Sequence, residues 1–156
     1  MSTPDHADQA SSISSLPSSR KMLCVVYAVI AVAALIATGS QNLAYFDEPA
    51  RYLHDFTNDL KVTPASRLFT ADVLLLGLAA SILMVVEARK HDVRFVWLYI
   101  VGGLAIAISV TFPLFLIARE LRMGPSEAPR VHTTDKILLA VVAALIVGLT
   151  IWVDVG

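Results

Sequence analysis

Charged residues are scarce in this chain of 156 residues, where Asp, Glu, Lys and Arg together make up 16%. Soluble domains average about a quarter charged residues, and here the deficit is concentrated in a few long apolar runs. Hydrophobic residues reach 56%, and the formal net charge of −1 gives no basic surface for a nucleic-acid partner. The low content of charged residues and the long apolar runs together indicate an integral membrane protein.

Cysteine is nearly absent as well. The single Cys24 lies inside the first apolar run, which excludes an intrachain disulfide and a cysteine-based metal site. The four histidines are scattered through the tail and loops without ligand spacing, so we expect no metal site. Gly-rich phosphate loops, Gly-x-Ser-x-Gly and His-Glu-x-x-His patterns are missing too. The sequence therefore predicts no cofactor.

Four apolar runs have the length of membrane-spanning helices, which need roughly 17–25 apolar residues. They cover residues 22–38, 68–86, 95–118 and 137–153. The third would extend about 36 Å as a straight helix, enough to cross with tilt. One such run could be the core helix of a soluble protein, but four in a chain of this size could not. The predicted fold class is all-α, a multi-pass membrane protein with a four-transmembrane-helix bundle.

The polar segments divide the chain further. Residues 1–21 form a Ser-rich tail that we expect to be disordered, and residues 22–156 form the membrane domain. The first apolar run has 17 residues, longer than the roughly 7–15 of a signal peptide, which favours a retained first span. Aromatic and charged residues mix between the first two runs, which predicts a short amphipathic helix at the interface.

Small residues at four-residue spacing recur in the later runs: Gly77 with Ser81, Gly103 with Ala107, and Ala144 with Gly148. In lipid, close approach of helices depends on such positions, because apolar burial alone gives no preference for helix over lipid tail. The spacing predicts a packed bundle.

Four straight spans would alternate in direction and thereby sort the connections by side. The N-terminus, the short turn at residues 87–94 and the C-terminus would share one side, and the two long connections would share the other. Lys and Arg then number five and seven on these sides, so the positive-inside rule does not settle the orientation.

The same alternation gathers polar residues near one face of the membrane. Those expected to converge are Asp72, Arg119, Glu120, Gln41 and Asn42. Glu87 is excluded, because it lies about 22 Å from Asp72 along the same helix.

Among these residues, Asp72 is the strongest candidate for a role in acid/base chemistry. An acidic residue inside a span costs about 2.5–3.5 kcal/mol, so it normally faces the bundle interior with a partner. In one interpretation Asp72 is a buried acid that donates a proton, with Arg119 or Glu120 tuning it, and all three are candidate catalytic residues. In the other, Asp72 and Arg119 form a structural ion pair.

Pro113 is the second feature of interest. It removes the backbone hydrogen bond to the carbonyl of Ser109, which predicts a kink in the third span. Hydroxyls at Ser109 and Thr111 would line that kink and, with Gln41 and Asn42, are candidate substrate-binding residues. The alternative, which proline kinks in membrane helices favour, is that Pro113 has only a structural role.

The central part of the chain resembles a known family of small integral membrane proteins of unknown function, the DUF2834 type. The resemblance covers roughly residues 69–120 and is carried by Ala71-Asp72, Glu87-Ala88-Arg89-Lys90, Trp97, Phe112-Pro113-Leu114-Phe115-Leu116 and Arg119-Glu120. It implies a compact membrane domain and no established activity. The polar tail and the fourth span depart from the shorter family pattern.

Two classes of function follow, and the sequence leaves open whether the protein is an enzyme. The first is binding or acid/base conversion of a lipophilic small molecule near Asp72, a cyclisation or isomerisation as in secondary metabolism. Small membrane-bound terpene cyclases offer a loose analogy, since they also protonate lipophilic substrates with intramembrane carboxylates. The alternative is a non-catalytic assembly or accessory subunit. The expected partners are the bilayer, a lipophilic small molecule and further copies of the chain. A third option, transport, would also require such a homo-oligomer, because four spans alone do not form a pore.

Overall fold

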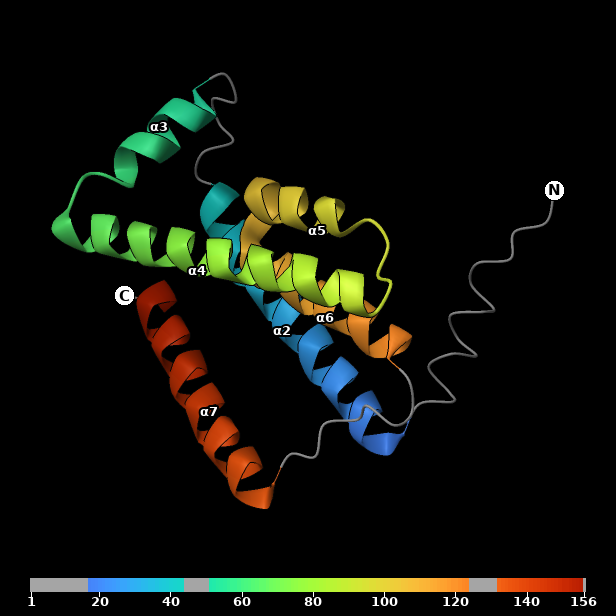
Figure 1. Cartoon of the computed structure of the whole chain (residues 1–156). Coiled ribbons are helices and arrows are strands. Elements are labelled where there is room, and N and C mark those ends of the chain that lie inside the picture. Colours follow the sequence, from blue (N-terminus) through green and yellow to red (C-terminus); the bar gives the residue numbers. More distant parts are fainter. Residues whose placement is uncertain (1–16, 44–50, 124–131, 156) are drawn as a thin grey trace. The chain divides into compact units, whose positions relative to one another are not determined.

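A computed structural model describes residues 17–43, 51–123 and 132–155, and these residues form helices joined by turns (Figure 1). In chain order the elements are α2 (Ser18–Asn42), α3 (Tyr52–Asp59), α4 (Pro64–Lys90), α5 (Val96–Gly102), the π-helical turn η2 (Gly103–Ala107), α6 (Ile108–Arg122) and α7 (Thr133–Val155). Four apolar helical stretches are long enough to cross a membrane, which confirms the all-α, multi-pass prediction. Most of the predicted disordered tail lies outside the described residues.

The helices match the apolar runs closely. Three of the predicted runs lie wholly inside α2, α4 and α7, and α3 is the short helix expected between the first two. The chain divides into two compact units, residues 1–123 and residues 124–156. The helix of the second unit, α7, has exposed apolar side chains along its length, as contact with lipid requires.

Local sequence fixes both ends of α4. At its start, the Thr63 side chain accepts a hydrogen bond from the Ser66 backbone N–H (3.0 Å), and the Ser66 hydroxyl accepts one from the Thr63 N–H (3.1 Å). This is a capping box, with Pro64 at the first helical position. At its end, Asp92 is left-handed (φ 51°) and the Val93 N–H bonds the Ala88 carbonyl at 2.9 Å, which is a Schellman motif.

The stretch that follows does not form a single straight helix. The rings of Tyr99 and Phe115 meet edge to face with centroids 5.8 Å apart, whereas 16 residues of straight helix would separate them by about 24 Å. The chain breaks at Ala107, whose backbone is extended (φ −172°, ψ 139°), and α6 folds back along α5 (Figure 1). The run at residues 95–118 was expected to cross as one span; it is long and apolar enough to do so, but in the structure it folds back at Ala107. This helical hairpin begins and ends at the same end of the unit.

Two glycines make the reversal sterically possible. A Cβ on Gly103 would lie 2.9 Å from both Thr111 Oγ1 and Ile108 Cδ1, and one on Gly102 would lie 3.3 Å from Thr111 Cγ2. The Gly103–Ala107 spacing thus serves a turn within one hairpin rather than the packing of two separate spans. The bend also precedes Pro113, which lies inside α6 and not at a kink of a longer helix.

The first unit has a small core where α4, α5 and α6 meet. Its buried residues are Met84, Ala88, Val93, Val96 and Phe115. The Schellman pair Ala88 and Val93 belongs to this core, so the turn that ends α4 also positions the hairpin. Outside this core, α2 packs mainly along α6.

Candidate functional site

Five side chains meet where α2 begins and where α4 and α6 end. We call them the ionic cluster: Arg20 of α2, Glu87 and His91 at the end of α4, and Arg119 and Glu120 near the end of α6. The three helix ends come together because the hairpin returns α6 to the end of the unit at which α4 finishes.

Arg20 and Glu120 form the buried half of the ionic cluster. Arg20 Nε lies 3.2 Å from Glu120 Oε2, and each side chain is at most 2% exposed. The Arg20 guanidinium also donates through Nη2 to the backbone carbonyls of Glu120 and Met123, the latter at 3.0 Å. A buried ion pair is tolerable only when further hydrogen bonds satisfy its remaining donors and acceptors, and Arg20 meets that condition.

Arg119 joins this pair to α4. Its Nε donates to Glu87 Oε2 at 2.5 Å, and its Nη1 donates to Glu120 Oε1 at 3.4 Å. His91 Nε2 lies 3.3 Å from Glu87 Oε2, within ion-pair distance although without hydrogen-bond geometry. Glu120 therefore bridges two arginines, and Glu87 links Arg119 to His91.

The ionic cluster changes how the sequence is interpreted. Alternating straight spans placed Glu87 on the opposite side from Arg119 and Glu120, and the contact between Glu87 and Arg119 shows this to be wrong. The physical reason is the hairpin, which makes α5 and α6 start and finish at one end. The adjacent glycines at 102 and 103 were the available signal for the reversal. Arg20, which lies just before the first apolar run, is not among the predicted site residues.

Asp72 stands apart from the ionic cluster. It lies about 22 Å from Glu87 along α4, and at about 100° per residue it is rotated about 120° from buried Met84 and about 160° from buried Ala88. Its side chain is exposed, and no ion pair to it occurs among the described residues. The structure does not bring Asp72 together with Arg119 or Glu120, either as a catalytic group or as a structural pair.

The candidate substrate-binding residues occupy two separate places. Gln41 and Asn42 lie at the end of α2, where Asn42 Oδ1 accepts a hydrogen bond from the Tyr52 hydroxyl at 3.5 Å and so ties α2 to α3. Ser109 is exposed at the start of α6, and Thr111 is buried against the hairpin glycines, its hydroxyl unbonded within the described part of the chain. Their role in substrate binding stays a prediction.

Metal-ligand geometry can be assessed over residues 17–43, 51–123 and 132–155. Within these ranges, no three His, Cys, Asp or Glu side chains lie close enough together to hold a metal ion. The carboxylates of the ionic cluster face arginines and a histidine instead.

The family described as "Protein of unknown function DUF2834" matches residues 26–121, more than half of the chain. The chain belongs to the DUF2834 family. The matched region runs from α2 to α6 and contains α3, α4 and the hairpin, so it extends well beyond the stretch that carried the resemblance. No curated protein and no solved structure matches the chain.

Membership in the DUF2834 family fits the multi-pass membrane architecture and supports no specific activity. The matched region contains the Glu87, His91, Arg119 and Glu120 part of the ionic cluster and also Asp72. Arg20 and α7 lie outside it. The ionic cluster thus joins the family region to a residue that precedes that region.

Proposed function

We propose that this DUF2834 protein is a non-catalytic accessory subunit that binds a second membrane protein through the outer face of α4, with Asp72 as the polar contact. The observation that carries the proposal is the exposed Asp72 carboxylate, set inside a predicted span and pointing away from the buried face of α4. An intramembrane carboxylate costs about 2.5–3.5 kcal/mol when inserted without a partner.

The surroundings of Asp72 suit a helix–helix contact. Residues at helical spacing on the same face are Leu68, Leu75, Leu76 and Ala79, and all four are exposed. Leucines flanking one acidic residue give apolar contact on both sides of a polar anchor, and Ala79 permits close approach. Because the face carries a single charge, it favours a partner helix with one matching cation.

This protein itself does not supply that cation from its remaining apolar helix. Residues 137–153 of α7 contain no Lys, Arg or His. A second copy packed symmetrically on the same face would bring another Asp72 to the same depth, and two like charges repel. Arg119, the basic residue expected to pair with Asp72, is engaged with Glu87 and Glu120. The partner we infer is a different membrane protein with Lys or Arg inside a span.

Site-specific photo-crosslinking tests the proposal. A photoreactive residue at Leu75 or Leu76 of the full chain, in native membranes, should capture a protein whose crosslinked span contains Lys or Arg. Asp72→Asn should abolish this crosslink, and Asp92→Asn in the exposed turn after α4 should leave it unchanged. Asp72→Lys should regain the crosslink only when the partner's cation is changed to Asp.

The competing acid/base hypothesis gives a different outcome. If Asp72 acts as a proton donor to a lipophilic substrate, Asp72→Asn removes a small-molecule product from cellular extracts. A crosslink that persists in Asp72→Asn together with such a loss would replace the accessory-subunit proposal with the acid/base one. A crosslinked span without any cation contradicts the proposal directly.

A further inference from the structure

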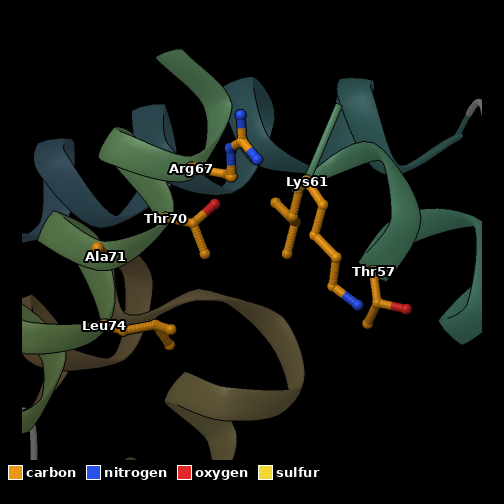
Figure 2. A pocket seen from close by; sticks show the side chains of 7 residues that line it. Thr57, Lys61, Arg67, Thr70, Ala71 and Leu74 are labelled. Carbon is orange, nitrogen blue, oxygen red and sulfur yellow. The ribbon is translucent and has the colours of Figure 1, made fainter. Parts of the chain in front are cut away.

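An open pocket of about 330 Å³ lies between α3 and the start of α4, away from both the ionic cluster and Asp72. One wall comes from the end of α3 and the turn after it, with Thr57, Leu60 and Lys61. The other is a single face of α4 with Arg67, Thr70, Ala71 and Leu74 at helical spacing (Figure 2). Asp72 lies on nearly the opposite face of α4, so the pocket is an independent feature.

The pocket has two cations at its rim. Lys61 and Arg67 contribute from the two walls, and both side chains are exposed. Neither has an ion pair with a carboxylate in the described ranges. Of the two acidic residues of α3, Asp55 in the first turn is engaged with Arg51 (3.8 Å) and His54 (3.1 Å), and Asp59 is the last residue of the helix. Two positively charged residues that line one opening favour an anionic group.

Part of the lining is apolar and continues along α4 toward the middle of its apolar run. Leu74 lies about 10 Å further along α4 than Arg67, and Ala71 lies between them on the same face. The Tyr52 and Phe56 rings of α3 stack with centroids 5.9 Å apart, which gives this short helix the aromatic character of an interfacial segment. The pocket therefore runs from headgroup level into the acyl region, so its ligand is an amphiphile rather than a free anion.

Two threonines line the pocket, and their hydrogen bonds indicate which kind of headgroup it would bind. Thr57 Oγ1 donates to the Leu53 carbonyl at 2.6 Å, and Thr70 Oγ1 donates to the Ser66 carbonyl at 2.7 Å. With their hydrogens used inside their own helices, both oxygens keep only acceptor lone pairs. They complement a headgroup that carries hydroxyl donors beside its negative charge.

We propose that the pocket between α3 and α4 binds an anionic glycerophospholipid with a hydroxylated headgroup, of the phosphatidylglycerol class. The phosphate lies between Lys61 and Arg67, the headgroup hydroxyls donate to Thr57 and Thr70, and the start of one acyl chain lies along Ala71 and Leu74. The site is separate from the partner surface around Asp72, so either proposal stands without the other.

Native mass spectrometry of the full chain released from nanodiscs of phosphatidylglycerol and phosphatidylcholine tests this site. Wild-type protein should retain one phosphatidylglycerol and no phosphatidylcholine. Lys61→Gln/Arg67→Gln should weaken retention roughly thirtyfold, because each cation near an anionic headgroup contributes about a fivefold effect. The matched control Arg89→Gln/Lys90→Gln removes two exposed cations at the other end of α4 and should leave retention unchanged.

A second variant separates a shaped pocket from charge attraction alone. Ala71→Phe fills the apolar part and keeps both cations, and since Ala71 is exposed the change should not disturb folding. It should lower phosphatidylglycerol retention at least tenfold. Unchanged retention in Ala71→Phe, or an equal loss in the Arg89→Gln/Lys90→Gln control, overturns the proposal. Phosphatidic acid, which has no headgroup hydroxyl beyond its phosphate, should bind more weakly, and equal binding would refute the role given to the threonines.

Discussion

The two ends of α4 use their charges in opposite ways. At its C-terminal end, Glu87 and His91 join Arg20, Arg119 and Glu120 in the ionic cluster, where Arg20 and Glu120 are almost completely buried. At its N-terminal end, Lys61, Arg67 and Asp72 are exposed and have no ion pairs within the described ranges. Charges at the first end hold the helices together. Those at the second end are available to molecules outside the chain.

This contrast depends on the hairpin of α5 and α6, which also alters the membrane topology. When the hairpin returns to its starting end, the ten Lys and Arg residues of the first unit divide seven to three between the ionic-cluster end and the α3 end. Straight spans would divide the same ten residues five to five. The positive-inside rule therefore predicts that the ionic-cluster end faces the cytoplasm or its equivalent compartment.

The largest expected effect is therefore an all-or-none difference in accessibility. In a Cys24→Ser background, single cysteines at positions 92 and 122 should react with a membrane-impermeant maleimide from one side, and a cysteine at position 61 from the other. The hairpin requires this result because α4 and α6 end together. Labelling of positions 122 and 61 from the same side would agree with a straight third span and would contradict the hairpin.

Loss of Glu120 should be the most destabilising single change at the ionic-cluster end. Glu120→Ala leaves Arg20 and Arg119 facing each other without their shared carboxylate, and breaking a buried ion pair in this way costs about 3–5 kcal/mol. Thermal unfolding in detergent should show a clearly lower Tm. Arg122→Ala, an exposed neighbour on the same helix, should change stability by less than about 0.5 kcal/mol. Equal Tm values for the two variants would show that the ionic cluster contributes nothing to stability.

Sequence reasoning recovered the parts of the fold that depend on local composition. The apolar runs predicted α2, α4 and α7 because length and hydropathy suffice for a membrane helix, and the aromatic and charged mixture after α2 predicted α3. The third run was identified as an apolar helical stretch, but its reversal was not predicted, because hydropathy carries no information on chain direction. A helix that reverses at Ala107 is as apolar as one that continues. The reversal depends on long-range contacts, such as that of Tyr99 with Phe115.

The candidate site was predictable only in part for the same reason. Arg119 and Glu120 were among the predicted site residues, but the predicted topology paired Arg119 with Asp72. In the structure Arg119 contacts Glu87, and Glu120 contacts Arg20. Asp72 was expected to face the bundle interior with a partner, whereas its side chain is exposed in the structure. Its outward orientation could not be read from hydropathy, because apolar residues occupy several faces of α4 around it.

The smallest effect we predict tests the hairpin at its tip. Gly103→Val places a branched side chain where a Cβ already lies 2.9 Å from Thr111 Oγ1 and Ile108 Cδ1, and such overpacking costs about 1–3 kcal/mol. The matched change Gly77→Val enters open space on α4 and should cost less than Gly103→Val in the same detergent unfolding assay. If the hairpin opens to relieve the overpacking, Gly103→Val should also expose a cysteine at position 111 to a membrane-permeant maleimide that the parent hairpin excludes. A Tm for Gly103→Val at or above that of Gly77→Val would show that α6 does not pack against the glycines, and the contrast between the two ends of α4 would lose its structural basis.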